Sequence, residues 1–185
     1  GSADILEALG VRITLSPTEM ARCLEEVGFA FLFAPALHPA MKHAQPARAE
    51  IKMRTAFNLL GPLTNPAGAG AQLIGASSER GAELMAHALS ELGTQRAFVV
   101  YGTDGLDEIT STAATVRFAV KPGEVVRHLV TPEDFGIPRA HLRDLHAATK
   151  DDNVAIARAV LAADPGPCRD IVLINASAAL VAAGQ

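Results

Sequence analysis

Short apolar runs alternate with amphipathic helical segments along this chain, and the alternation limits the folds open to it. Apolar runs of strand length lie at 29–33, 72–76 and 97–101, with helical patterns before, between and after them. Strand–helix–strand repetition is typical of a parallel sheet with helices on its faces. The sequence therefore predicts an α/β fold with a mostly parallel central sheet flanked by helices.

Capping residues mark where the predicted helices begin and end. The segment 16–19, Ser-Pro-Thr-Glu, has the pattern of a capping box with proline at the first helical position, and Gly28 ends that helix. Either Ser77 or Ser78 caps a second helix, which runs to Leu92. These signals place amphipathic helices on both sides of the second apolar run.

The second half of the chain adds a predicted hairpin and two further segments. Apolar runs at 116–120 and 125–129 are separated by Lys121-Pro122-Gly123, which predicts an antiparallel pair of strands. A helix is expected over 151–163. The segment 170–183 begins like a strand, but its alanine-rich continuation favours a helix.

Composition excludes several classes of function. The chain is 49% hydrophobic and 19% charged, so it is globular, and no apolar stretch is long enough to cross a membrane. Aromatic residues make up 4% and the net charge is −4, so no nucleic-acid partner is expected. Cys23 and Cys168 match no zinc spacing and are interpreted as buried thiols of a reducing compartment, the cytoplasm. One domain over 1–185 is the economical interpretation.

The segment 38–66 is too irregular for a plain core element, because prolines divide it and cations lie between them. A chain that places these residues beside an apolar turn is suited to forming a pocket for an anion, and a solvated basic loop over a core turn is the alternative. The prolines are Pro39, Pro46, Pro62 and Pro66, and the cations are Lys42, Arg48, Lys52 and Arg54.

Three carboxylates, Asp104, Asp107 and Glu108, follow the predicted strand at 97–101. In an α/β sheet, ligands gather at the carboxyl ends of parallel strands. Crowded carboxylates repel one another unless a cation lies among them, and Mg²⁺ takes one or two carboxylates together with phosphate oxygens and water. A solvated acidic turn is the alternative, since Thr-Asp-Gly-Leu-Asp-Glu is rich in turn-forming residues.

Three stretches resemble the anthranilate phosphoribosyltransferases, and they occur in that family's order. They are GSADILEALG at 1–10, HPAMK with RTAFNLLGPLTNP inside 38–66, and YGTDGLDEIT at 101–110. The resemblance covers essentially the whole chain, although Ile51-Lys52 stands where the family usually has Leu-Gly. It implies a glycosyltransferase of tryptophan biosynthesis that moves a phosphoribosyl group from phosphoribosyl pyrophosphate (PRPP) to the amine of anthranilate, giving phosphoribosyl-anthranilate and pyrophosphate.

The resemblance also implies a set of binding residues, with no residue acting as a nucleophile. Without it, Arg48 is a surface residue beside Glu50, Gly61 is a helix C-cap, and Ser2 is a helix cap or the remnant of a tag. With it, two Mg²⁺ ions are expected at Asp107 and Glu108, anthranilate at Arg48, His38 and Gly61, and PRPP at Ser2.

The fold implied by the resemblance is the larger, C-terminal α/β domain of a two-domain enzyme, related to the pyrimidine nucleoside phosphorylases. The family's glycine-rich GTGGD loop, its KHGNR stretch and the helical domain that forms a homodimer are expected before Gly1, and a helical tail is expected after Gln185. Two alternatives stay open: the chain alone is a non-catalytic fragment of such an enzyme, or it belongs to a related pyrimidine nucleoside phosphorylase.

Overall fold

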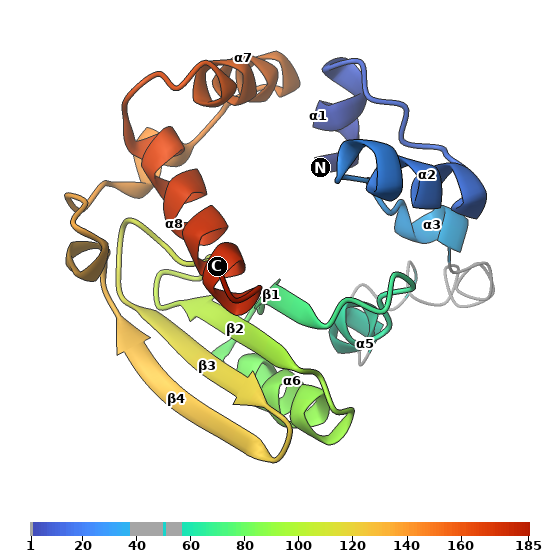
Figure 1. Cartoon of the computed structure of the whole chain (residues 1–185). Helices are drawn as coiled ribbons and strands as arrows, with labels where there is room; N and C mark the ends of the chain where they lie inside the picture. Colours follow the sequence, from blue (N-terminus) through green and yellow to red (C-terminus); the bar gives the residue numbers. More distant parts are fainter. Residues whose placement is uncertain (1, 38–49, 51–56) are drawn as a thin grey trace. The chain divides into compact units, whose positions relative to one another are not determined.

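The computed structural model describes residues 2–37, 50 and 57–185, and the chain divides into two compact units. The first unit comprises residues 1–55 and 147–157, and the second comprises 56–146 and 158–185. Helices of the first unit are α1 (Ser2–Ala8), α2 (Pro17–Val27), α3 (Ala34–Leu37) and the start of α7 (Lys150–Leu161), which ends in the second (Figure 1).

The second unit contains the sheet and the helices that cover it. Its strands are β1 (Ala71–Gly75), β2 (Arg96–Gly102), β3 (Thr115–Lys121) and β4 (Glu124–Val130). Its complete helices are α5 (Phe57–Leu63), α6 (Glu79–Glu91), α8 (Pro167–Ala182) and the 3₁₀ turns η1 (Pro132–Phe135) and η2 (Leu142–Leu145) (Figure 1). This arrangement confirms the α/β class.

The four strands lie in the order β1-β2-β3-β4, and the sheet is mixed. β1 and β2 run parallel, with Leu73 opposite Phe98, because α6 carries the chain back between them. β2 and β3 are antiparallel, with Tyr101 opposite Val116, and β3 pairs antiparallel with β4. The expectation of a mostly parallel sheet is therefore wrong in the described part of the chain. The connection over 103–114 contains no helix, so the chain returns beside β2 in the opposite direction.

The antiparallel pair predicted over 116–129 is confirmed as β3 and β4. A two-residue loop joins the strands, with Lys121 opposite Glu124. Gly123 has φ +72°, which an L side chain rarely adopts, so glycine is the residue that this tight turn requires.

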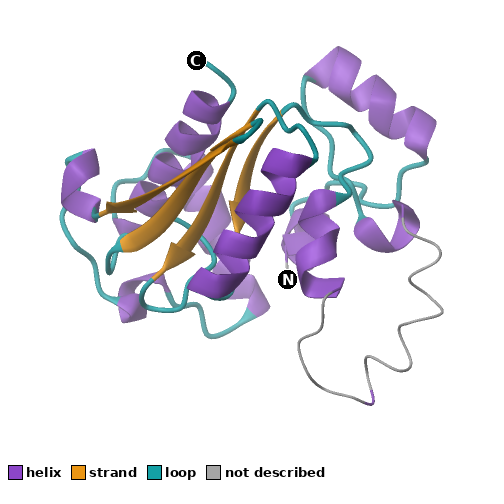
Figure 2. Ribbon diagram, turned by 90° about the horizontal axis from the view of Figure 1, so that it is seen from below, coloured by secondary structure: helices purple, strands orange, loops and turns teal. Residues whose placement is uncertain are grey.

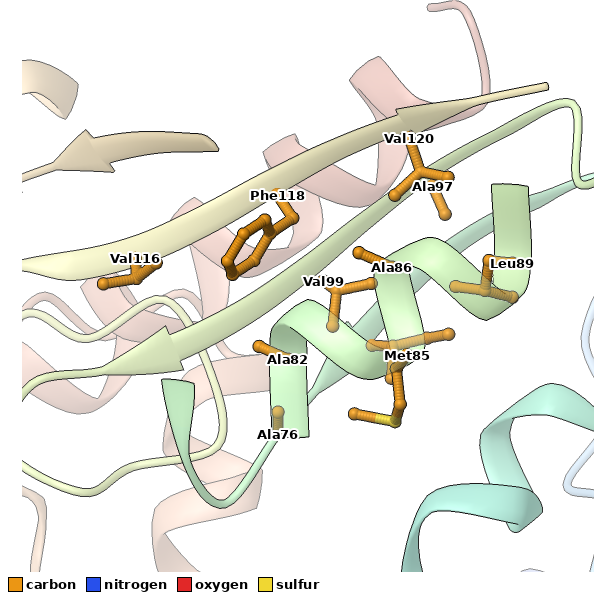
Figure 3. Packing of buried hydrophobic residues seen from close by; sticks show 11 residues of the cluster. Ala76, Ala82, Met85, Ala86, Leu89, Ala97, Val99, Val116, Phe118 and Val120 are labelled. Carbon is orange, nitrogen blue, oxygen red and sulfur yellow. The ribbon is translucent and has the colours of Figure 1, made fainter. Parts of the chain in front are cut away.

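Helices cover both faces of the sheet in the second unit, as Figure 2 shows. Alternate residues of β2 point to opposite faces, so Val99 packs against α6 while Val100 packs against α8. Figure 3 shows the α6 side, where Met85 and Leu89 of α6 belong to one buried cluster with Val99 and Phe118 of the sheet. The continuous apolar strand β2 is thus buried on both faces, whereas the edge strand β4 is mostly exposed.

The helix caps agree with the sequence. Ser16 Oγ accepts a hydrogen bond from the N–H of Glu19 at 3.3 Å, and Glu19 Oε2 accepts one from the N–H of Ser16 at 2.8 Å, completing the capping box. For α6, the sequence left two serines open, and the structure selects Ser78, whose Oγ accepts from the N–H of Gly81 at 3.1 Å. The ambiguous segment 170–183 is helical, as α8.

The strand expected at 29–33 does not form. This segment has no strand partner among the described residues, and a strand needs a neighbour to satisfy its backbone groups. Phe29 is 58% exposed, and the rings of Phe31 and Phe33 stack on each other with centroids 6.4 Å apart. The apolar run is therefore used for ring contacts rather than for a sheet.

Two smaller expectations are also settled. Cys23 and Cys168 are free thiols but are only partly buried, so they are not core residues. None of the described helices combines the length and the apolar character needed to pass through a bilayer.

Burial on α6 allows a matched test of the core. Leu89 is 1% exposed and Leu84 is 45% exposed on the same helix. We expect Leu89→Ala to lower the free energy of unfolding by about 2–5 kcal/mol, because a buried leucine leaves a cavity. Leu84→Ala should change it by less than about 1 kcal/mol, since leucine and alanine differ little in helix propensity. Urea denaturation measures both, and equal losses would contradict the assignment of the core.

Candidate functional site

The predicted acidic residues lie in the loop 103–114, which starts where β2 ends. β1 and β2 run parallel, so their carboxyl ends, at Gly75 and Gly102, lie at the same edge of the sheet. The acidic loop is thus at the edge where α/β proteins bind ligands. This placement agrees with the location expected from the sequence.

Two glycines allow the acidic loop to lie against the strand ends. A Cβ on Gly75 would overlap the backbone carbonyl oxygen of Asp107, so any side chain there would push the loop away. A Cβ on Gly102 would lie 2.5 Å from Asp104 Oδ1 and 3.1 Å from the carbonyl oxygen of Leu106. Sequence reasoning missed both residues. The available signal was a glycine closing each of two apolar strands, which marks a close approach of another backbone.

Asp104 organises the loop from within. Its Oδ1 accepts a hydrogen bond from the N–H of Leu106 at 3.2 Å, and its Oδ2 accepts from the hydroxyls of Thr110, at 2.6 Å, and Thr112. Burial opposes ionisation of this carboxyl, but the hydrogen bonds from Thr110 and Thr112 outweigh it and hold the pKa of Asp104 below its ordinary value. Asp104 is therefore an ionised, internally satisfied residue that shapes the turn.

Asp107 and Glu108 are arranged differently. Neither side chain has a hydrogen bond or ion pair to any described residue, and Asp107 is exposed. Burial of Glu108, together with the negative charges of Asp107 and Asp104, raises the pKa of Glu108. A half-buried carboxyl beside two others is electrostatically unfavourable when ionised, and a bound cation would relieve this repulsion.

The acid pair fits a metal ion that is shared with a second ligand. Among the described residues, no group of three His, Cys, Asp or Glu side chains could hold a metal by itself. Two adjacent carboxylates without other partners match Mg²⁺, which keeps several waters and binds substrate phosphates alongside one or two protein carboxylates. The donor set is hard oxygen only, as Mg²⁺ prefers.

The other predicted site residues are not brought together by the described structure. Ser2 is the first residue of α1, in the first unit, and is exposed. Gly61 lies inside α5, in the second unit, so it is not a helix C-cap. Among the described residues, no atom lies within 4 Å of where its Cβ would be, and Gly61 is exposed. His38 and Arg48 fall outside the described residues, so their distance from the acid pair stays a prediction.

Comparison with known proteins identifies what this arrangement is similar to. The sequence model of the glycosyl transferase family, a/b domain, matches residues 1–185. The anthranilate phosphoribosyltransferase of Solibacter usitatus is 57% identical over 185 residues, which cover 100% of this chain and 54% of that protein. The protein of the same name from Moorella thermoacetica is 56% identical over 184 residues, with the same coverage. The chain thus spans about half the length of these curated relatives.

Solved structures give the same result. Anthranilate phosphoribosyltransferase from Saccharomyces cerevisiae in complex with PRPP and Mg superposes with a TM-score of 0.85 at 25% identity, covering 95% of this chain and 51% of that one. The same yeast enzyme in complex with 4-fluoroanthranilate superposes with a TM-score of 0.81 at 25% identity, with the same coverage. The resemblance inferred from three sequence stretches is therefore confirmed.

The close approach at Gly75 can be tested by adding one methyl group. Gly75→Ala should lower the free energy of unfolding by about 3 kcal/mol, because the Cβ meets backbone that cannot rotate away. Gly61→Ala is the control, since its Cβ enters open space inside a helix and should be neutral or stabilising by up to about 1 kcal/mol. Thermal or urea unfolding compares the two, and a tolerated Gly75→Ala would refute the packing of the loop.

The raised pKa of Glu108 predicts how stability depends on pH. Folding favours the protonated carboxyl of Glu108. The stability that this preference contributes is fully present below the ordinary pKa of 4.5 and is lost as the pH rises through the folded pKa. Glu108→Gln removes the ionisation. The variant should therefore gain stability relative to the unaltered protein as the pH rises above 4.5, measured by urea denaturation at a series of pH values without metal.

Glu133 provides a control of opposite sign. Two hydrogen bonds from Arg139, each 3.1 Å long, hold the pKa of Glu133 at about 2. Its contribution is present above the ordinary value of 4.5 and is lost as the pH falls through the folded pKa. Glu133→Gln should accordingly lose stability relative to the unaltered protein at neutral pH, and less so in acid. The same trend for both variants would contradict the proposed environment of Glu108.

Proposed function

This chain belongs to the glycosyl transferase family through its α/β domain, and we propose that the protein in which it occurs is an anthranilate phosphoribosyltransferase. The reaction transfers a phosphoribosyl group from PRPP to the amine of anthranilate and releases pyrophosphate. The observation that carries this proposal is the unpaired acid doublet at the ends of two parallel strands, in a chain 57% identical to an enzyme of that name. We further propose that 1–185 forms one α/β domain, because the family match extends over that whole range.

The proposed metal site consists of Asp107 and Glu108, with two Mg²⁺ ions. The yeast neighbour in complex with PRPP and Mg supports the choice of metal. When bound, Mg²⁺ supplies positive charge that offsets the charge gathering on the leaving pyrophosphate. The chain's part is to hold two carboxylates at a fixed edge of the sheet, with Asp104 and its threonines keeping the loop in shape.

The proposed acceptor site consists of Arg48, His38 and Gly61. A guanidinium can hold the carboxylate of anthranilate with two parallel hydrogen bonds, and it stays charged at any working pH. Gly61 suits a close approach of the ligand, since no atom of the described part of the chain lies within 4 Å of its missing Cβ. Such residues direct the nitrogen of anthranilate toward the ribose carbon that leaves pyrophosphate. Positioning of this kind can lower the activation barrier by up to about 7–11 kcal/mol.

The remaining assignments complete the proposal. Ser2, exposed at the start of α1, contacts the PRPP donor. The full protein is a homodimer of the cytoplasm that binds neither nucleic acid nor membrane, which the acidic net charge of −4 supports. No residue acts as a covalent nucleophile, so substrate binding and orientation, together with the metal, provide the catalysis.

The experiment uses the complete protein that carries this chain and removes both negative charges, as Asp107→Asn with Glu108→Gln. We expect turnover of PRPP and anthranilate to fall by roughly 10²–10³ or more, because stabilisation of the leaving group is lost. Metal-dependent binding of PRPP should weaken in parallel. Turnover is measured by the consumption of anthranilate, followed by its fluorescence, and PRPP binding is measured by calorimetry, both at saturating Mg²⁺.

The matched control is Glu124→Gln, which neutralises an exposed carboxylate in the β3–β4 turn, at the sheet end opposite to Gly102. This variant should keep the turnover of the unaltered protein. Normal rates in the double variant would overturn the metal assignment. Phosphorolysis of a pyrimidine nucleoside, with no turnover of anthranilate, would overturn the proposed reaction.

A further inference from the structure

We infer that Asn175 of α8 is a positioning residue that clamps the Ile109 peptide and so directs the Asp107-Glu108 carboxylates toward a bound cation. The inference rests on the proposed function for the identity of the cation site. It names a residue 66 positions away in the sequence, on a different element, as part of that site's support.

The clamp consists of three hydrogen bonds from one side-chain amide. Asn175 Oδ1 accepts from the N–H of Ile109 at 2.9 Å, and Asn175 Nδ2 donates to the carbonyl oxygen of Ile109 at 2.8 Å. The same Nδ2 donates to the carbonyl oxygen of Ile171, one turn earlier in α8, at 2.9 Å. The amide thus pairs with both backbone groups of Ile109 as a neighbouring strand would, and its own helix orients it.

These hydrogen bonds bear directly on the acid pair. The N–H of Ile109 belongs to the peptide plane that joins it to Glu108, so holding this N–H sets the direction of the Glu108 backbone. Ile109 is 1% exposed and packs in the core beside Ile171 and Ile174, which anchors the far side of the peptide. Among the described residues, no other hydrogen bond reaches residues 107–109.

The loop is therefore held from two sides. The backbone oxygen of Asp107 rests against Gly75 of β1, and the next peptide, which joins Glu108 to Ile109, is bound by Asn175 of α8. The acid pair lies between these supports. Asparagine is a poor helix former, and a half-buried amide is costly unless its hydrogen bonds are made. Its presence beside the apolar buried residues of α8 is explained by the peptide that it binds.

The test compares Asn175→Leu with Ser90→Ala in the complete protein. Ser90 Oγ donates to the carbonyl oxygen of Lys121 at 2.8 Å, so Ser90→Ala also removes a buried bond between a helix and the sheet backbone, but away from the acid pair. Two quantities are measured: hydrogen exchange at the Ile109 amide by NMR, and the Mn²⁺ concentration for half-saturation, by electron paramagnetic resonance with PRPP present. Mn²⁺ serves as the probe for Mg²⁺.

We expect Asn175→Leu to accelerate exchange at Ile109 and to raise the half-saturating Mn²⁺ concentration at least about tenfold, as loss of a supporting residue does at metal sites. Ser90→Ala should lower the melting temperature and leave both quantities unchanged. Asn175→Ala removes the amide without adding bulk, and it replaces the leucine variant should that variant fail to fold.

An unchanged Mn²⁺ affinity in the Asn175 variants would overturn the positioning role, even with faster exchange at Ile109. Equal loss of Mn²⁺ affinity in Ser90→Ala would also overturn it, because general destabilisation would then explain the effect. Failure of the unaltered protein to bind Mn²⁺ with PRPP would contradict the proposed function and this inference together, so the two failures are distinguishable.

Discussion

The site depends first on a close contact between two stretches of backbone. The carbonyl of Asp107 lies where Gly75 would carry its side chain, so the acidic loop rests directly on the end of β1. β1 pairs with β2, and β2 is covered by helices on both faces, so the strand that the loop rests on is held in place by a packed core. A rigid base of this kind lets a loop hold charged groups in a fixed direction.

The three carboxylates of the loop differ in the hydrogen bonds that they accept, and this difference gives them different roles. Asp104 receives hydrogen bonds from Thr110, Thr112 and the N–H of Leu106, so its charge is stabilised inside the protein. Glu108 receives none from the described residues, and its pKa is raised by burial and by its two neighbours. The same loop therefore contains one carboxylate that supports its structure and two whose mutual repulsion a bound cation would relieve. Functional sites commonly show such opposed shifts in pKa.

Local signals in the sequence predicted most of the fold. The capping box at Ser16 and the turn at Gly123 act on their immediate neighbours and were found where expected, and the structure selects Ser78 from the two serines that the sequence left open. The strand at 29–33 and the mostly parallel sheet were wrong, because pairing depends on segments far apart in sequence. The acid pair was visible in the sequence, whereas its supports were not. Gly75 and Asn175 act through contacts with residues 32 and 66 positions away, which no local pattern shows.

The supports also tie the site to the folding of its unit. Gly75 belongs to β1 and Asn175 to α8, which are separated in the sequence by α6, the other three strands, η1, η2 and α7. The acid pair reaches its final position only when both elements have packed against β2, since a loop without these contacts samples many directions. Loosening of α8 would therefore release the peptide of Ile109 before the sheet itself opens. For this reason the cation site should form late in folding and be among the first features lost on unfolding, even though the charges of its carboxylates act on only a small part of the sheet.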